Sequence, residues 1–133
     1  MGTVTAGVEV DEGTEYRVLV VDDEPTMGAL VAEYLEHVDG RLDVSHTAAP
    51  TTAIERLDGS FDCVVTDYEM PMLDGLSLIE RAETDAEFVL FTQAGGEEVA
   101  GAAREAGASY MQKRTDTAQY EELAALIREL AGG

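Results

Sequence analysis

Short apolar runs alternate with amphipathic stretches along most of the chain. The apolar runs are rich in valine and phenylalanine, whereas the stretches between them repeat apolar residues at helical spacing. This alternation predicts successive βα units and a mostly parallel sheet. We predict strands at residues 17–21, 41–46, 61–66, 87–92 and 108–112.

The first two predicted strands differ in their expected burial. Segment 17–21 (RVLVV) is apolar after its first residue, which is typical of a central strand buried on both faces. Segment 41–46 (RLDVSH) alternates Leu42 and Val44 with polar residues, which favours a half-buried strand at the edge of the sheet.

Amphipathic stretches predict the helices. Pro25 suits a first helical turn, and the helix that it opens ends before Gly40. Its apolar positions are Met27, Leu30, Val31, Tyr34, Leu35 and Val38. The last helix, 117–130, carries Tyr120, Leu123, Ala124, Ile127 and Leu130 on one face. Shorter helices contain Ala53, Ile54 and Leu57, and Leu76, Leu78, Ile79 and Ala82. An alanine-rich helix at 97–106 looks marginally stable.

Short connections between parallel strands require right-handed crossovers. The predicted product is an α/β fold, a flavodoxin-like doubly wound (βα)5 parallel sheet of strand order 2-1-3-4-5. We expect one domain at 16–131, preceded by a flexible tail at 1–15 that lacks a helical pattern. In this fold the functional crevice lies at the carboxyl ends of strands 1 and 3.

The net charge of the chain limits the kinds of partner that it can bind. Eight basic and 28 acidic side chains give a formal net charge of −20, which repels nucleic acid and anionic lipid alike. We therefore expect no direct nucleic-acid binding and no membrane binding. The acidic residues form either one face for a basic partner or a surface adapted to high intracellular salt. Their spread over every predicted helix favours the second interpretation, a halophilic source.

Cysteine content and hydropathy indicate the compartment. Cys63 is the single cysteine, which excludes an internal disulfide and fits a reducing environment. No apolar run approaches the roughly 18 to 20 residues that cross a bilayer, and residues 1–16 do not resemble a signal peptide. We predict a cytoplasmic protein.

Five side chains that carry chemistry stand at the ends of predicted strands. Asp22 and Asp23 follow strand 1, Asp67 follows strand 3, Thr92 ends strand 4 and Lys113 follows strand 5. On the predicted sheet all five lie at one edge. Clustered carboxylates repel one another unless they are protonated or share a cation, and hard oxygen ligands suit Mg²⁺. A carboxylate can also attack phosphorus, and the acyl phosphate then needs metal and ammonium charge nearby.

Four successive motifs, VLVVDDEP, VVTDYEMPMLDG, FVLFT and SYMQK, resemble those of response-regulator receiver domains. The resemblance covers residues 16–131 and implies a two-component signalling switch. It implies that Asp67 accepts a phosphoryl group from a histidine kinase. It also implies that Asp23, Asp67 and the backbone carbonyl of Glu69 bind Mg²⁺ directly, with Asp22 helping through water.

The same resemblance assigns the readout. Thr92 is the switch hydroxyl, Lys113 contacts the phosphoryl group, and Tyr110 changes rotamer together with Thr92. The protein would not be an enzyme beyond its own phosphotransfer and autodephosphorylation. Its surface formed by helix 4 (97–106), strand 5 and helix 5 (117–130) would meet a downstream protein or an attached output domain, or form a phosphorylation-dependent dimer.

Three residues depart from the family pattern. Arg114 follows the lysine where the family usually has proline after a cis peptide, so the sequence leaves the Lys113–Arg114 peptide undecided. Gln93 stands where a small residue is usual, and Glu69 adds a charge near the acceptor. We expect the last two side chains to slow or redirect the attack of water on the acyl phosphate.

Other interpretations account for part of the pattern. Asp22 and Asp23 could cap a helix, Thr92 could serve β-propensity, and Tyr110 could be core. A Mg²⁺-dependent aspartyl-nucleophile phosphohydrolase is the alternative function. Such enzymes, however, typically have a D-x-D motif after strand 1 and usually carry a cap domain. A flavin or dinucleotide module is disfavoured because no G-x-G-x-x-G follows strand 1.

Overall fold

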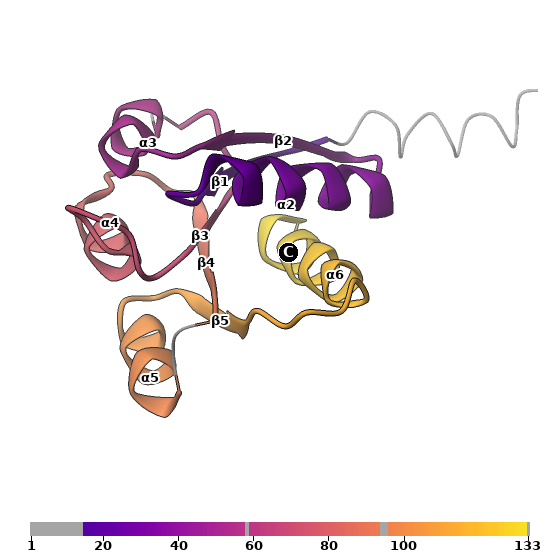
Figure 1. Cartoon of the computed structure of the whole chain (residues 1–133). Coiled ribbons are helices and arrows are strands. Elements are labelled where there is room, and N and C mark those ends of the chain that lie inside the picture. Colours follow the sequence, from indigo (N-terminus) through magenta and orange to yellow (C-terminus); the bar gives the residue numbers. More distant parts are fainter. Residues whose placement is uncertain (1–14, 58, 94–95, 133) are drawn as a thin grey trace, which may run out of the picture.

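A five-stranded parallel sheet runs through the chain, with helices on both of its faces (Figure 1). The computed structural model describes residues 15–57, 59–93 and 96–132. The strands are β1 (Tyr16–Val21), β2 (Leu42–Thr47), β3 (Cys63–Thr66), β4 (Glu87–Thr92) and β5 (Ser109–Gln112). The helices are α2 (Pro25–Val38), α3 (Pro50–Arg56), α4 (Gly75–Arg81), α5 (Glu97–Glu105) and α6 (Gln119–Gly132). The predicted tail at 1–15 lies, apart from Glu15, outside the described residues.

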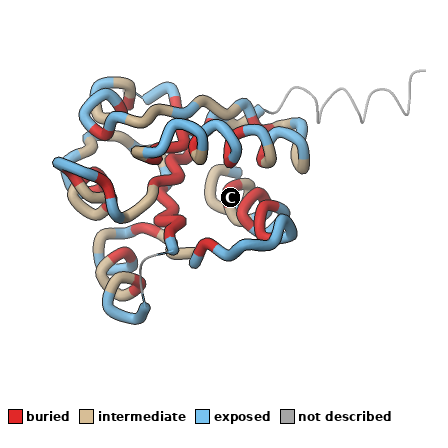
Figure 2. Tube along the Cα trace, viewed as in Figure 1, coloured by how far each residue is buried: buried red, intermediate tan, exposed pale blue. Residues whose placement is uncertain are grey.

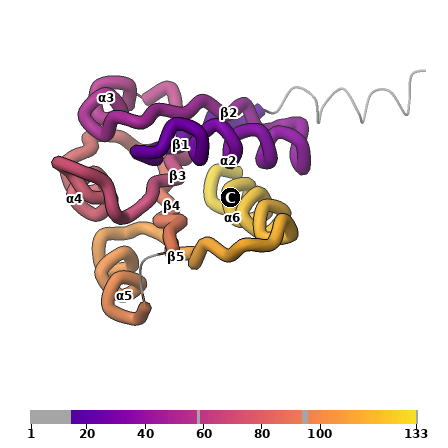
Figure 3. The backbone as a smooth tube through the Cα atoms, in the orientation of Figure 1, coloured from indigo at the N-terminus to yellow at the C-terminus, as the bar shows by residue number. Residues whose placement is uncertain are grey.

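The strands follow the order β2-β1-β3-β4-β5, which confirms the predicted topology (Figure 3). All four neighbouring pairs are parallel. Val21 at the end of β1 pairs with Thr66 at the end of β3. The residues that follow these two strands therefore emerge side by side at the carboxyl edge of the sheet.

Helices α2 and α6 cover one face of the sheet, and α3, α4 and α5 cover the other (Figure 1). The central strands are buried between these layers, whereas the outer sides of the helices are exposed (Figure 2). The Tyr34 and Tyr120 rings stack between α2 and α6, with centroids 4.6 Å apart. Both helices thus share one apolar layer against the sheet.

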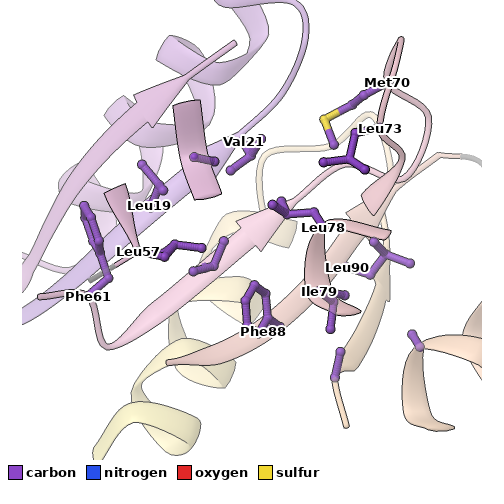
Figure 4. Close-up of a cluster of buried hydrophobic side chains, with 14 residues drawn as sticks. Leu19, Val21, Leu57, Phe61, Met70, Leu73, Leu78, Ile79, Phe88 and Leu90 are labelled. Atoms are coloured by element: carbon purple, nitrogen blue, oxygen red, sulfur yellow. The ribbon is translucent and has the colours of Figure 1, made fainter. Parts of the chain in front are cut away.

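Alternate residues of each central strand supply the two halves of the core. In β1, Leu19 and Val21 face the layer of α3, α4 and α5, whereas Val18 and Val20 face the opposite layer. Figure 4 shows the first cluster, to which Leu78 of α4 and Leu90 of β4 both contribute. The apolar pattern of the first predicted strand therefore does bury both of its faces, as predicted.

Several predicted boundaries shift by one or two residues. The strand predicted at 61–66 begins at Cys63, because Asp62 instead accepts the Arg17 N–H through its carboxylate at 2.8 Å. The strand predicted at 41–46 runs from Leu42 to Thr47 and is half-buried at the sheet edge, as expected. The last helix begins at Gln119, two residues later than predicted.

Two further features of the described residues are the buried cysteine and the length of the helices. Cys63 is fully buried in β3, and burial raises the pKa of its thiol to about 12, so the thiol stays protonated. Among the residues that the structure describes, no helix is both long enough and apolar enough to span a bilayer.

Candidate functional site

A cavity of about 190 Å³ opens at the carboxyl edge of the sheet, beside the ends of β1, β3 and β4. Its lining is mostly polar and acidic. The lining residues are Asp22, Asp23, Glu24, Met27, Asp67, Glu69, Thr92, Gln93 and Lys113. The structure therefore brings together all five strand-end residues that the sequence singled out, whereas the predicted switch residue Tyr110 is not among the described lining residues.

Backbone hydrogen bonds fix the two aspartates that directly follow paired strands. The Asp67 N–H donates to the Val21 carbonyl at 3.0 Å, and the Asp22 N–H donates to the Thr47 carbonyl at 3.1 Å. These bonds extend the parallel ladder by one residue beyond each strand. The carboxylates of both residues are consequently held by the most buried strands of the molecule.

Three carboxylates converge in the cavity. Asp22, Asp23 and Asp67 each place an oxygen within 4.8 Å of the other two. Asp22 is buried, and the other two are half-buried. This set of hard oxygen donors, open to solvent on one side, fits the coordination that Mg²⁺ prefers, in which several positions are left for water or phosphate.

Lys113 supplies the positive charge of the cavity. Its ammonium nitrogen lies 3.3 Å from an Asp22 carboxylate oxygen and 3.9 Å from an Asp67 carboxylate oxygen. The ammonium also lies 5.3 Å from the centroid of the Phe91 ring, within cation–π range. Only 7% of this side chain is exposed, so little water screens its interactions.

Asp22 is held in an environment that disfavours its charged form. Burial raises the pKa of Asp22 above its usual value, and the nearby Asp67 carboxylate acts in the same direction. The Glu24 N–H, which donates to Asp22 at 3.0 Å, and the Lys113 ammonium act in the opposite direction. Because the net effect is upward, the ionised site gains free energy from a further cation.

The loop after Asp67 is closely packed against that residue. The Tyr68 N–H donates to the Asp67 carboxylate at 2.7 Å, and the Gly75 N–H donates to the Tyr68 carbonyl at 2.8 Å. A Cβ atom at Gly75 would collide with the Asp67 carbonyl oxygen and would lie 2.7 Å from the Leu90 side chain. Glycine is therefore required where α4 begins.

The remaining part of this loop is exposed. Met72 adopts a φ of 73°, a left-handed conformation that is unusual for methionine, and 96% of the residue is accessible to solvent. Asp74 ends the loop and caps α4 by accepting the Ser77 N–H at 2.8 Å. The loop thus joins the half-buried Asp67 to an exposed apolar side chain.

The predicted switch residues occupy different environments. Thr92 is 1% exposed and lines the cavity. Tyr110 packs on the other side of β5, against the layer of α3, α4 and α5, and is not among the cavity-lining residues that the structure describes. Its hydroxyl oxygen is buried without a hydrogen-bond partner in the described part of the chain. An orphaned buried hydroxyl costs roughly 1–3 kcal/mol.

The sequence left the isomer of the Lys113–Arg114 peptide undecided. No peptide bond in the described residues is cis, so the Lys113–Arg114 peptide is trans. Gln119, which sequence reasoning did not single out, is 2% exposed and hydrogen-bonds to the backbone of Arg114. No sequence pattern indicated this interaction, because Gln119 stands before the apolar stripe of its helix.

The model of the response regulator receiver domain family matches residues 18–125 of the chain. Among curated relatives, the chemotaxis protein CheY1 of Helicobacter pylori is 32% identical over 87 residues, which cover 60% of this chain and 69% of the relative. The transcriptional regulatory protein FlgR of the same organism is 32% identical over 76 residues, 57% of this chain. That match spans only 20% of FlgR.

Several solved structures of receiver domains have a fold similar to that of this chain. The Francisella response regulator 1452 receiver domain superposes with a TM-score of 0.76 at 21% identity, over 89% of this chain and 98% of the other. A CheY-like receiver domain protein from Methanospirillum hungatei gives a TM-score of 0.74 at 20% identity, over 87% and 96%. At such identities the similarity concerns the fold alone.

Proposed function

The chain belongs to the response-regulator receiver domains, and from this premise we propose that Asp67 accepts a phosphoryl group from a histidine kinase. In this reaction an Asp67 carboxylate oxygen attacks the phosphorus of a phosphohistidine. The bond between phosphorus and the imidazole nitrogen breaks, and the imidazole leaves with that electron pair. The product is an aspartyl phosphate in the cavity.

One observation carries the proposal: the Lys113 ammonium lies within 4 Å of carboxylate oxygens of both Asp22 and Asp67. A nucleophilic carboxylate that becomes an acyl phosphate gains negative charge in a partly buried site. That charge needs fixed positive partners, because the low local dielectric strengthens repulsion from Asp22 and Asp23. The position of its ammonium supports Lys113 as such a partner.

The second proposed partner is a divalent metal ion. Asp23, Asp67 and the backbone carbonyl of Glu69 would hold Mg²⁺ directly, and Asp22 would contribute through water. When bound, the ion supplies charge neutralisation for the phosphoryl oxygens. The convergence of three carboxylates on one point and the upward pKa of Asp22 support this assignment.

The proposed readout begins at Thr92. Its hydroxyl would donate a hydrogen bond to a phosphoryl oxygen, which moves the end of β4 toward Asp67. Tyr110, on the neighbouring strand, has a buried hydroxyl with no hydrogen-bond partner among the described residues and would change rotamer with Thr92. The altered surface would lie around α5, β5 and α6, where a downstream protein, an attached output domain or a second phosphorylated copy would bind.

Exposure to acetyl phosphate and Mg²⁺ tests the proposal without the kinase. We expect intact mass to increase by one phosphoryl group, and peptide mapping to place it on Asp67. Asp67→Asn should remove the modification, whereas Asp43→Asn, at an exposed position of β2, should retain it. Absence of modification at Asp67 would refute the proposal, and steady turnover of a generic phosphoester would favour the phosphohydrolase.

A further inference from the structure

Gln119 is a buried polar residue outside the cavity, at the start of α6. Its amide oxygen accepts the Arg114 N–H at 2.6 Å, and its amide nitrogen donates to the Arg114 carbonyl at 2.6 Å. The same nitrogen donates to the Asp116 carbonyl at 2.7 Å. One side chain thus satisfies both backbone groups of the residue that follows Lys113.

The surroundings give the connection little other support. Residues 114–118 are all exposed, so no apolar side chain anchors this segment in the core. The Arg114 side chain forms ion pairs with Asp116 and Glu122 at 3.0 Å, but these pairs lie at the surface, where salt screens them. The neutral, partly buried hydrogen bonds of Gln119 are not weakened by salt in this way.

Lys113 is consequently held from two sides. On one side its N–H donates to the Thr92 carbonyl at 2.8 Å, which ties it to β4. On the other side, Gln119 fixes the peptide that directly follows it. The position of the ammonium between Asp22 and Asp67 depends on where this backbone lies, since the rest of the side chain spans from there to the cavity.

We infer that Gln119 is a positioning residue for Lys113: it holds the Arg114 backbone so that the ammonium reaches the phosphoryl-acceptor site. This inference rests on the proposed function, in which Lys113 contacts the phosphoryl group. It assigns Gln119 no contact with the phosphoryl group itself. The residue acts only through the lysine.

Gln119→Met tests the inference, because methionine is similar in length and apolar but forms none of the three hydrogen bonds. The readouts are the affinity for the phosphoryl mimic beryllofluoride in saturating Mg²⁺, and the affinity for Mg²⁺ alone. We expect beryllofluoride affinity to fall at least about tenfold, because the misplaced ammonium no longer forms its charge-assisted hydrogen bond to the mimic. Mg²⁺ affinity should stay equal or increase, because the carboxylates are intact and the competing ammonium is displaced.

Ile127→Val is the matched control. It shortens a buried side chain in the same helix and so lowers stability, but it leaves residues 114–118 unchanged. It should leave both affinities unchanged. Lys113→Met provides the second control: in that background, Gln119→Met should cause no further decrease in beryllofluoride affinity. Additive decreases, or parallel decreases of both affinities, would overturn the inference.

If Gln119→Met does not fold, Gln119→Glu answers the same question, because its carboxylate still accepts the Arg114 N–H but cannot donate to the two carbonyls. We expect the same selective decrease in beryllofluoride affinity, and unchanged affinity would contradict the inference. Failure of the wild-type protein to bind beryllofluoride would instead refute the proposed function. The two failures are therefore distinguishable.

Discussion

The Lys113 ammonium lies 3.3 Å from an Asp22 carboxylate oxygen, although the two residues stand 91 positions apart in the chain. Each partner is almost completely buried, so neither can exchange the other for water at low cost. In the absence of a divalent cation, the lysine is the positive charge that the acidic cavity contains. A metal ion entering the cavity must therefore meet or displace this ammonium.

Lys113→Met should accordingly strengthen Mg²⁺ binding while it weakens the response to phosphoryl groups. We expect Mg²⁺ affinity to increase about tenfold, or roughly 1.4 kcal/mol, because a repelling charge is removed from the cavity. Isothermal titration at low salt measures the change. Arg104→Met, which removes an exposed charge on α5, should alter the affinity far less. Weaker Mg²⁺ binding by Lys113→Met would contradict the expectation.

Asp22→Asn should stabilise the metal-free protein near neutral pH. Burial raises the pKa of Asp22 in the folded state, so the folded form binds the proton more tightly than the unfolded form does. The stability that this tighter proton binding contributes is fully present below pH 3.8, the usual pKa of aspartate. It is lost as pH rises through the raised pKa of the folded state. The asparagine variant avoids this loss.

Urea unfolding in a chelator, repeated across acidic to neutral pH, measures the difference between wild type and Asp22→Asn. The gain in free energy of unfolding should appear as pH rises above 3.8 and should then level off. Asp43→Asn, at an exposed position, should give no such pH-dependent gain. A pH-independent difference for Asp22→Asn would show that ionisation is not its cause.

Gly75→Ala should destabilise the domain by about 1–3 kcal/mol, the usual cost of an overpacked site. The added methyl group collides with the Asp67 backbone and the Leu90 side chain, so one of these groups must move. Gly101→Ala is the control, because its methyl group meets nothing within 4 Å inside α5. That variant should gain about 0.5–1 kcal/mol. Denaturant unfolding separates the two outcomes.

Gln93→Ala should shorten the lifetime of the aspartyl phosphate. Gln93 lines the cavity beside Thr92, and its removal opens the site to the water that attacks phosphorus. The rate at which phosphate leaves protein labelled with acetyl phosphate gives the half-life. Gln112→Ala, an exposed glutamine at the end of β5 that does not line this cavity, is the matched control. An unchanged half-life for Gln93→Ala would remove the proposed role.

The protein should become more stable as KCl is added. A net charge of −20 repels itself across the surface, and salt screens that repulsion within a Debye length of roughly 10 Å at 0.1 M. A melting series from dilute buffer to molar KCl tests the proposed halophilic source. Full stability in dilute buffer would argue against that source.

The fold could be predicted from sequence because its signals are local. The continuous apolar run of β1 and the helical stripe of α2 determine their own elements, and crossover handedness then leaves few arrangements. Boundaries were less predictable, since they depend on partners elsewhere. The Arg17 N–H, for example, donates to the Asp62 carboxylate, and β3 begins one residue later, at Cys63.

The candidate site likewise contains residues that the sequence could predict and one that it could not. Asp22, Asp67 and Lys113 could be placed together because strand order alone brings their strand ends to one edge. Their chemical roles remain predictions. Gln119 could not be found, because its burial depends on the path of an irregular connection that no periodic pattern describes.

The parallel pairing of every strand has a consequence for biosynthesis. No strand that the structure describes pairs with a partner through a local hairpin, so each pairing requires closure of a long loop through a helix. A nascent chain that ends before β5 contains Asp22 and Asp67 but lacks the ammonium between them. Under the proposed function, an incomplete chain of this kind could not stabilise an aspartyl phosphate, and the site would be complete only once β5 has joined the sheet.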